Sequence, residues 1–154
     1  MDLEAAEWRI PAERMKMRLP HIVPLSARAL SVLRDLQPLT GQFECVFPSH
    51  RSPRRLMSEN AVLAALRAMG YPKEVMTGHG FRAMARTLLD EVLGYRVDWI
   101  EHQLAHAVRD ANGRAYNRTA HLDGRKKMLQ GWADYLGQLQ QKASGSIDQL
   151  LSNT

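Results

Sequence analysis

The sequence predicts an α+β fold that is mainly α-helical and carries a small β-hairpin or sheet at its N-terminal end. Two short β-prone runs lie before residue 26, and most apolar segments after them repeat at the spacing of an amphipathic helix. The chain has 154 residues, of which 45% are hydrophobic and 24% are charged. It is therefore long enough to bury the core of one globular domain.

The N-terminal hairpin is predicted from two short runs. Residues 7–10 alternate in polarity and are followed by Pro11, which is typical of a strand end, and residues 21–25 form a second β-prone run. The segment between them, residues 12–20, is polar and basic. We expect it to form the tip of the hairpin, and that tip carries Lys16.

Helical periodicity and capping residues predict the remaining elements. Ser26 and Ser58 are candidate N-caps of the first two helices, because a serine side chain can accept a hydrogen bond from the first helical turn. Pro38 and Gly70 would end these helices. The predicted helices lie at about residues 26–38, 58–70, 81–93, 97–105 and 121–139, and residues 37–57 are predicted to be mostly loop, with 43–47 extended.

Charge and composition narrow the function classes. The net charge is +5 and the sequence pI is about 9.7, so the chain attracts polyanions. Basic residues cluster at 14–18, 50–55 and 125–127, which suits a surface that touches a nucleic-acid backbone at several points. No apolar run approaches the roughly 18 residues of a membrane span, and Cys45 cannot form an internal disulfide. We expect a cytoplasmic protein, with Cys45 as a buried thiol.

One candidate phosphate site is His79 with Arg82. Residues three apart share a helix face, so an imidazole and a guanidinium would point into the same space and could hold two phosphate oxygens. A solvated helix start with a capping histidine explains the same pair. His106 and Arg109 repeat the spacing, and there His106 could simply satisfy a helix C-terminus.

Two further residues could carry chemistry near a phosphate. Tyr116 lies between Arg114 and Arg118, whose positive field favours the phenolate and attracts phosphate. Lys16 could protonate a leaving oxygen if neighbouring cations lowered its pKa. On residue chemistry alone, Tyr116 could equally anchor the loop before the last helix, and Lys16 could be an ordinary hairpin lysine.

Other chemistries find less support. His102 and His106 are four residues apart, a spacing that can bind a metal on one helix face, but the HExxH order is absent and no third ligand follows nearby. The sequence has no GxxxxGK[ST] phosphate loop, no CxxC pair and no GxSxG elbow. We therefore expect neither a metal nor a cofactor.

Several of these pieces occur in a fixed order with further motifs over about residues 2–140. They lie at residues 12–18, 20–26, 46–49, 57–60, 77–85, 103–106, 115–118 and 132–136. Each is weak alone, but in this order and spacing the sequence resembles the catalytic domain of the tyrosine recombinase family, prophage integrase type.

The resemblance implies a role for five residues. Lys16 would be the general acid toward the leaving 5′-hydroxyl. His79 and Arg82 would be the HxxR box on the scissile phosphate, and His106 the later histidine that donates to a phosphate oxygen. Tyr116 would be the nucleophile. Its 3′-phosphotyrosyl bond would store the phosphodiester energy, so the resemblance implies no ATP and no metal.

The resemblance also chooses between competing residues. His79 with Arg82 is the box, since His106 takes the later position. Tyr135 lies in an amphipathic segment beside Trp132 and is expected to pack rather than react.

The resemblance further implies how the chain is organised. Residues 1–142 would be a partial catalytic domain, and residues 143–154 a flexible tail. The family has another catalytic arginine in an upstream Arg-x-x-Glu helix, which Arg9 does not match. We therefore expect this chain to lack that helix and the core-binding and arm-binding domains, and to be inactive alone. Residues 104–106 read Leu-Ala-His where the family usually has Leu-Gly-His, which affects the geometry of the turn.

The resemblance implies a protein of the bacterial nucleoid that binds double-stranded DNA at attachment sites and no membrane. It also implies further copies of the protein in a tetrameric synapse, and accessory DNA-bending or excision factors. Two alternatives stay open. One is a DNA-binding remnant without catalytic activity, for which the basic clusters would suffice. The other is a relaxing enzyme similar to type IB topoisomerases. A metal-dependent nuclease built on His102 and His106 ranks below both.

Overall fold

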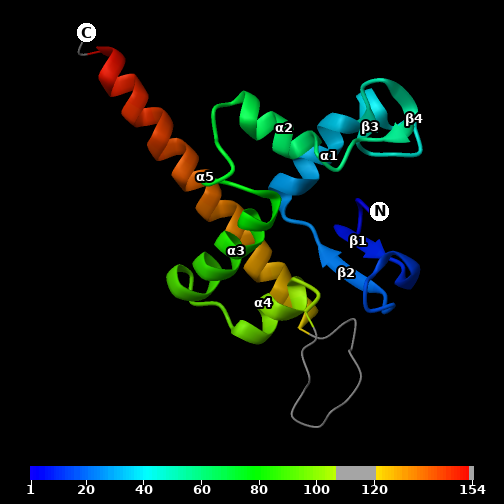
Figure 1. The fold of residues 1–154 in the computed structure, drawn as a ribbon. Helices are drawn as coiled ribbons and strands as arrows, with labels where there is room; N and C mark the ends of the chain where they lie inside the picture. The colour runs from blue at the N-terminus through cyan, green and yellow to red at the C-terminus, as the bar shows by residue number, and fades with distance from the viewer. Residues whose placement is uncertain (107–120, 153–154) are drawn as a thin grey trace.

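The computed structural model describes residues 1–106 and 121–152, with side chains up to residue 146 (Figure 1). Its described part is mainly helical with two small antiparallel hairpins, which confirms the predicted α+β class. The strands are β1 (Glu7–Ile10), β2 (His21–Pro24), β3 (Pro48–Ser49) and β4 (Ser52–Leu56), and a short helical turn, η1, covers Ala12–Arg14. The helices are α1 (Ala27–Thr40), α2 (Ala61–Ala68), α3 (Gly78–Thr87), η2 (Leu88–Val92), α4 (Val97–Gln103) and α5 (Leu122–Ser152).

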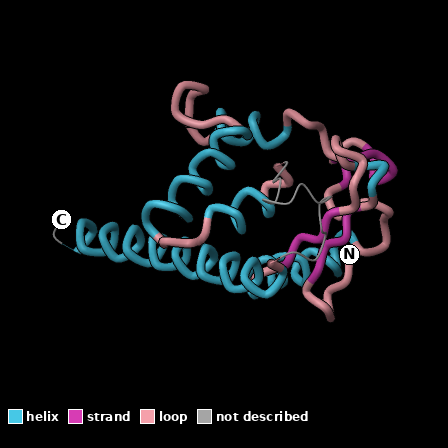
Figure 2. The backbone as a smooth tube through the Cα atoms, turned by 90° about the horizontal axis from the view of Figure 1, so that it is seen from below, coloured by secondary structure: helices cyan, strands magenta, loops and turns pink. Residues whose placement is uncertain are grey.

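The long helix α5 is the element on which the others assemble. It contacts α1, α4 and β2, and Figures 1 and 2 show it running the length of the molecule beside them. Helix α3 continues into η2, a π-helical turn that leads to α4. Within the described ranges, no helix is both long enough and apolar enough to cross a membrane.

The predicted N-terminal hairpin is present. β1 and β2 pair antiparallel from Glu7 opposite Pro24 to Ile10 opposite His21, and the basic segment between them forms the tip. Lys16 lies in that tip with an exposed side chain.

The two serine caps have different outcomes. Ser26 caps α1 as predicted, because its Oγ accepts a hydrogen bond from the Ala29 amide at 3.3 Å. Ser58 does not cap α2. Its Oγ accepts from the Asn60 amide at 3.3 Å in the turn before the helix, which begins only at Ala61. Gly70 follows the end of α2 with a φ of 87°, a conformation that glycine adopts without strain.

The prolines of residues 37–57 led to a wrong prediction in two places. Helix α1 continues through Pro38 to Thr40, although Pro38 has no amide to donate. The Thr40 hydroxyl donates to the Leu36 carbonyl and the Gly41 amide donates to the Gln37 carbonyl, and these bonds hold the last turn. Residues 48–56 form the β3–β4 hairpin rather than loop, and residues 43–47 lie outside the strands. Pro53 is tolerated in β4 because a two-stranded hairpin has outer edges where a strand needs no amide donor.

Two other helix bounds differ from the prediction. α3 begins at Gly78, where the Thr77 hydroxyl accepts from the Gly80 amide at 3.0 Å and so caps the helix. α5 continues to Ser152, well past the predicted end near Leu139. That residues 143–154 form a flexible tail stays a prediction.

The core lies where η2, α4 and α5 meet. Leu89, Ile100 and Met128, one from each element, are buried against one another. Partly buried apolar side chains surround them: Leu93, Tyr95, Trp99, Leu104 and Trp132. This core holds the C-terminal end of α4 in place, which is where several of the predicted site residues meet.

Candidate functional site

The site is built around the turn that ends α4, which comprises residues 103–106. The Ala105 amide donates to the His102 carbonyl at 3.1 Å, and the His106 amide donates to the Glu101 carbonyl at 3.0 Å. These two bonds and the left-handed φ of 55° at Ala105 define a Schellman motif. The turn places the His106 side chain just beyond the helix, half-exposed to solvent.

Arg82 reaches this turn from α3. Its Nη2 donates to the Leu104 carbonyl at 2.7 Å, at the helix end where the carbonyl groups carry partial negative charge. The bond leaves most of the guanidinium donors of Arg82 directed at solvent, since its side chain is exposed. The structure thus brings the predicted Arg82 and His106 to the same turn.

Glu101 holds the His106 ring. Its carboxylate accepts from His106 Nδ1 and, at 2.6 Å, from Nε of Arg86. The bond to His106, and then the bond to Arg86, lower the pKa of Glu101 below its ordinary value, although burial of the carboxylate acts in the opposite direction. With Nδ1 engaged, Nε2 of His106 is the ring nitrogen left to face a ligand.

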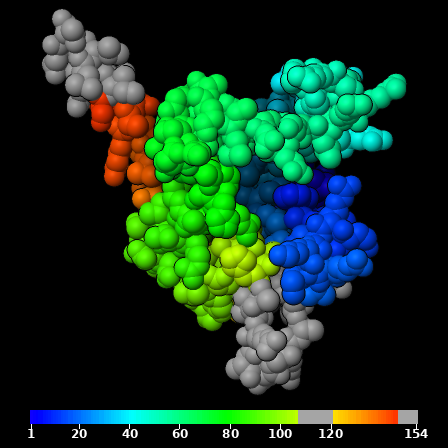
Figure 3. Space-filling view, in the orientation of Figure 1, coloured from blue at the N-terminus to red at the C-terminus, as the bar shows by residue number. Residues whose placement is uncertain are grey.

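The tip of the first hairpin lies against the same turn. Met15, Met17 and Leu19 line a small hollow together with Ala105 and His106. Figure 3 shows the hairpin, in blue, against the yellow-green end of α4. Lys16 therefore belongs to a segment that borders His106.

The remaining predicted residues are placed less fully. His79 lies in the first turn of α3, three residues before Arg82, and its side chain is exposed. Among the described residues, none forms a hydrogen bond or an ion pair with the His79 side chain. Tyr116 lies outside the described residues, as do Arg109, Arg114 and Arg118.

The prediction for Arg125 is wrong. The sequence places it in a basic surface cluster at 125–127, but its side chain is fully buried. Its Nε and Nη2 donate to Gln103 Oε1 at 3.0 and 2.7 Å, and Nη2 also donates to the Ile22 carbonyl. The spacing carried the signal: Arg125 lies three residues before Met128, on the apolar face of α5.

A buried histidine adjoins Arg125. The Nε2 atom of His21 lies 3.3 Å from the Gln103 carbonyl, with which it forms a hydrogen bond. Burial, and then the Arg125 charge beside it, lower the pKa of His21 from 6.5 to about 4. His21 is therefore neutral at physiological pH and can donate to that carbonyl.

His102 and His106 do not have the geometry of a metal site on one helix face. α4 ends at Gln103, so His106 lies beyond the helix and does not share a helix face with His102. His102 is buried beside the rings of His21 and His121. Among the described residues, no group of three or more potential ligands surrounds a common point.

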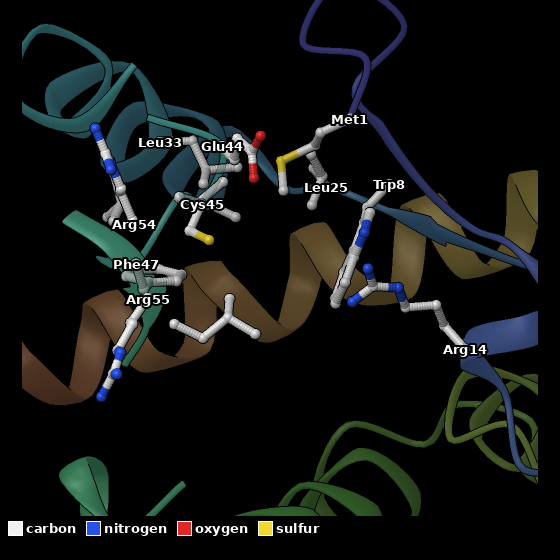
Figure 4. A pocket seen from close by; sticks show the side chains of 14 residues that line it. Met1, Trp8, Arg14, Leu25, Leu33, Glu44, Cys45, Phe47, Arg54 and Arg55 are labelled. Atoms are coloured by element: carbon white, nitrogen blue, oxygen red, sulfur yellow. The ribbon is translucent and has the colours of Figure 1, made fainter. Parts of the chain in front are cut away.

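A large hollow lies on another part of the molecule, between the first hairpin, α1 and the β3–β4 hairpin. Figure 4 shows Trp8 and Arg14 on one side of it, with Cys45, Phe47 and Arg55 on the other. Cys45 is only partly buried, which corrects the prediction of a buried thiol. The described members of the predicted catalytic set, Lys16, His79, Arg82 and His106, do not line this hollow.

Comparison with known proteins identifies the family. The model described as the phage integrase family matches residues 1–122. The integrase of Enterobacteria phage P4 is 45% identical over 149 residues, which cover 88% of this chain and 34% of that protein. The prophage integrase IntA of Escherichia coli (strain K12) is 45% identical over 134 residues, which cover 87% of this chain and 32% of that protein. The integrase of Shigella phage Sf6 is 36% identical over 137 residues, with 88% and 35% covered.

The chain therefore belongs to the phage integrase family, in agreement with the tyrosine recombinase resemblance of its motifs. It spans about a third of the length of the curated relatives it matches. No solved structure matches it.

Proposed function

We propose that this chain is most of the catalytic domain of a site-specific DNA recombinase, which cuts and rejoins DNA during integration and excision. The observation that carries the proposal is the α4 turn, where Arg82 and His106 meet beside the hairpin that bears Lys16. Cations and hydrogen-bond donors gathered at one exposed turn suit a phosphate diester. Membership of the phage integrase family supports the same activity.

In the proposed reaction, Tyr116 loses its proton to water while its oxygen bonds to the scissile phosphorus. The bond between phosphorus and the 5′-oxygen breaks, and Lys16 gives that oxygen a proton. The products are a 3′-phosphotyrosyl bond and a free 5′-hydroxyl. The 5′-hydroxyl of a partner strand can later attack the phosphotyrosyl bond and release Tyr116. His79, Arg82 and, with its ring protonated on both nitrogens, the Nε2–H group of His106 would stabilise the charge that develops on the phosphate oxygens.

The proposed partners follow from the reaction. The substrate is double-stranded DNA, and an exchange between two duplexes calls for several copies of the protein, for which we propose a tetrameric synapse. Exposed Arg51, Arg54 and Arg55 on the second hairpin provide further positive charge for the DNA backbone. Accessory DNA-bending or excision factors belong to the same proposal.

The test uses the intact protein that contains this chain and a pool of nicked suicide duplexes covering the DNA that flanks its gene. A covalent adduct should form, survive denaturing electrophoresis and disappear in Tyr116→Phe. A Tyr135→Phe variant is the matched control and should still form the adduct. If Tyr116→Phe forms the adduct as well as the natural protein does, Tyr116 is not the nucleophile.

A second candidate is a DNA-binding protein without strand cleavage, favoured by the exposed arginines of β4. This candidate predicts binding that weakens steeply with salt, with no adduct on any duplex of the pool.

A further inference from the structure

We propose that Arg125 and Gln103 form a positioning lock that holds the Lys16 hairpin beside the His106 turn. The proposal rests on the function proposed above. It assigns to two side chains, buried Arg125 and partly buried Gln103, the task of keeping the general acid in place.

The lock joins three elements through one guanidinium. Arg125 projects from α5, donates through Nη2 to the Ile22 carbonyl of β2, and donates through Nε and Nη2 to the side chain of Gln103 in α4. β2 is the strand that closes the hairpin whose tip carries Lys16. α4 is the helix whose final turn carries His106.

A second bond joins the same two elements. His21, the first residue of β2, bonds through Nε2 to the Gln103 carbonyl at 3.3 Å. Gln103 thus accepts from Arg125 through its side chain and from His21 through its backbone. The next carbonyl along the chain, that of Leu104, accepts from Arg82. A displacement of Gln103 would therefore change both the contact with His21 in β2 and the contact of Leu104 with Arg82.

An arginine at position 125 suits the positioning of neighbouring elements better than it suits filling space in the core. A buried guanidinium costs free energy of desolvation, which an apolar side chain of similar volume would not. What it adds is a planar set of donors with fixed directions. Those donors set the distance between β2 and α4, whereas apolar contacts have no fixed direction and would allow the hairpin to shift along α4.

The hairpin depends on this lock more than α4 does. α4 is fixed independently by Ile100 in the core and by the Glu101 contacts to Arg86 and His106. Among the described residues, the hairpin is tied to the helices by the Arg125 lock, by the bond of His21 to the Gln103 carbonyl, and by the ion pair of Glu7 with Lys126 at 3.4 Å. Loss of Arg125 should therefore displace Lys16 while His106 keeps its place.

Displacement of a general acid has a chemical signature. An oxygen leaving group needs a proton as its bond breaks, whereas a sulfur at the same 5′ position leaves as a thiolate and needs none. A misplacement of about 1 Å can slow a reaction about 100-fold. A defect that arises through Lys16 should therefore vanish on the sulfur substrate, and a defect in folding or phosphate binding should not.

The experiment measures single-turnover adduct formation by the intact protein on a cleavable duplex carrying either oxygen or sulfur at the scissile 5′ position. Arg125→Met should be slowed about 100-fold on the oxygen substrate and should approach the natural rate on the sulfur substrate. Lys16→Ala should behave in the same way. Gln103→Glu keeps the acceptor oxygens and should keep the oxygen rate, while Gln138→Met, an exposed change on the same helix, is the control for α5.

The outcomes separate the lock from the proposed function. Equal slowing of Arg125→Met on both substrates, or no slowing on either, overturns the lock. If Arg125→Met does not fold, Gln103→Met takes its place and must show the same selective loss on oxygen. A natural protein that forms no adduct on either substrate refutes the proposed function itself, and a Lys16→Ala variant that sulfur does not rescue refutes the role of Lys16.

Discussion

Ala105 shows how a single backbone angle shapes the site. It occupies the left-handed position of the turn that ends α4, with a φ of 55°, where its Cβ meets the following carbonyl. Glycine would adopt this angle freely, and the family resemblance indicates glycine there. The turn is therefore locally strained, and the surrounding hydrogen bonds keep it in this conformation.

Replacing Ala105 with glycine should raise the free energy of unfolding by about 0.5–1 kcal/mol, because it removes the left-handed penalty. Urea denaturation of the purified chain measures the change. Ala64→Gly, an exposed position inside α2, is the control and should lower stability by about 1 kcal/mol. Equal destabilisation by both substitutions would contradict the strain.

His21 should make stability depend on pH between about 6.5 and 4. Its pKa is lowered to about 4 in the folded chain, mainly by burial and then by Arg125, and is 6.5 in the unfolded chain. Above pH 6.5 both states hold a neutral ring. As pH falls through this window the unfolded chain gains a proton that the folded chain refuses, so up to roughly 3 kcal/mol of stability is lost.

Urea denaturation at about pH 7 and about pH 4.5 tests this dependence. His21→Asn keeps an amide donor for the Gln103 carbonyl but cannot titrate, so its stability should change less between the two values. The lowered pKa values of Asp98 and Glu101 act at still lower pH, where their protonation removes stabilising contacts. A His21→Asn variant that loses as much stability as the natural chain would show that another group governs this window.

At the scale of elements, α5 depends on a glycine for its contact with α4. A Cβ on Gly124 would lie 2.5 Å from the Trp99 ring, which packs beside the buried Ile100. The absence of a side chain at residue 124 therefore lets the indole lie directly on the backbone of α5. Sequence reasoning treats a helical glycine only as a weak point.

Gly124→Ala should lower the free energy of unfolding by about 1–3 kcal/mol, because the Trp99 ring cannot move without disturbing the core. Gly137→Ala in the same helix is the control. Its Cβ would meet only Arg28 Nη1 at 3.5 Å, so alanine should stabilise the chain by up to about 1 kcal/mol. Thermal unfolding of both variants compares them, and a stabilised Gly124→Ala would disprove the close contact.

The elements also show which parts of the fold and of the site the sequence predicts. Strand alternation and the Ser26 cap predicted the first hairpin and the start of α1, because both signals are local. The β3–β4 hairpin was missed because prolines at an edge resemble loop. Spacing made Arg82 and His106 candidates, and the family resemblance gave them their roles. Glu101 and Arg125 are not predicted, because their roles depend on contacts that only the folded turn and the packed helices create.

At the scale of the whole molecule, the described part of the chain leaves several large apolar side chains exposed to solvent. Some of them line the large hollow between the first hairpin, α1 and the β3–β4 hairpin, where Phe47 is 50% and Leu56 is 66% exposed. This wall of the hollow therefore offers an apolar surface to solvent.

We expect this hollow to bind a hydrophobic dye such as anilinonaphthalene sulfonate, whose sulfonate suits the arginines beside the apolar wall. The double variant Phe47→Ser with Leu56→Ser should lose most of the dye fluorescence. Its thermal midpoint should stay near that of the natural chain, because side chains this exposed contribute little burial. Val75→Ser removes a side chain that is 62% exposed but lies outside the hollow, and should leave the fluorescence unchanged. Equal fluorescence in the double variant and the natural chain would mean that the dye binds elsewhere, and that the apolar wall of the hollow is closed in solution.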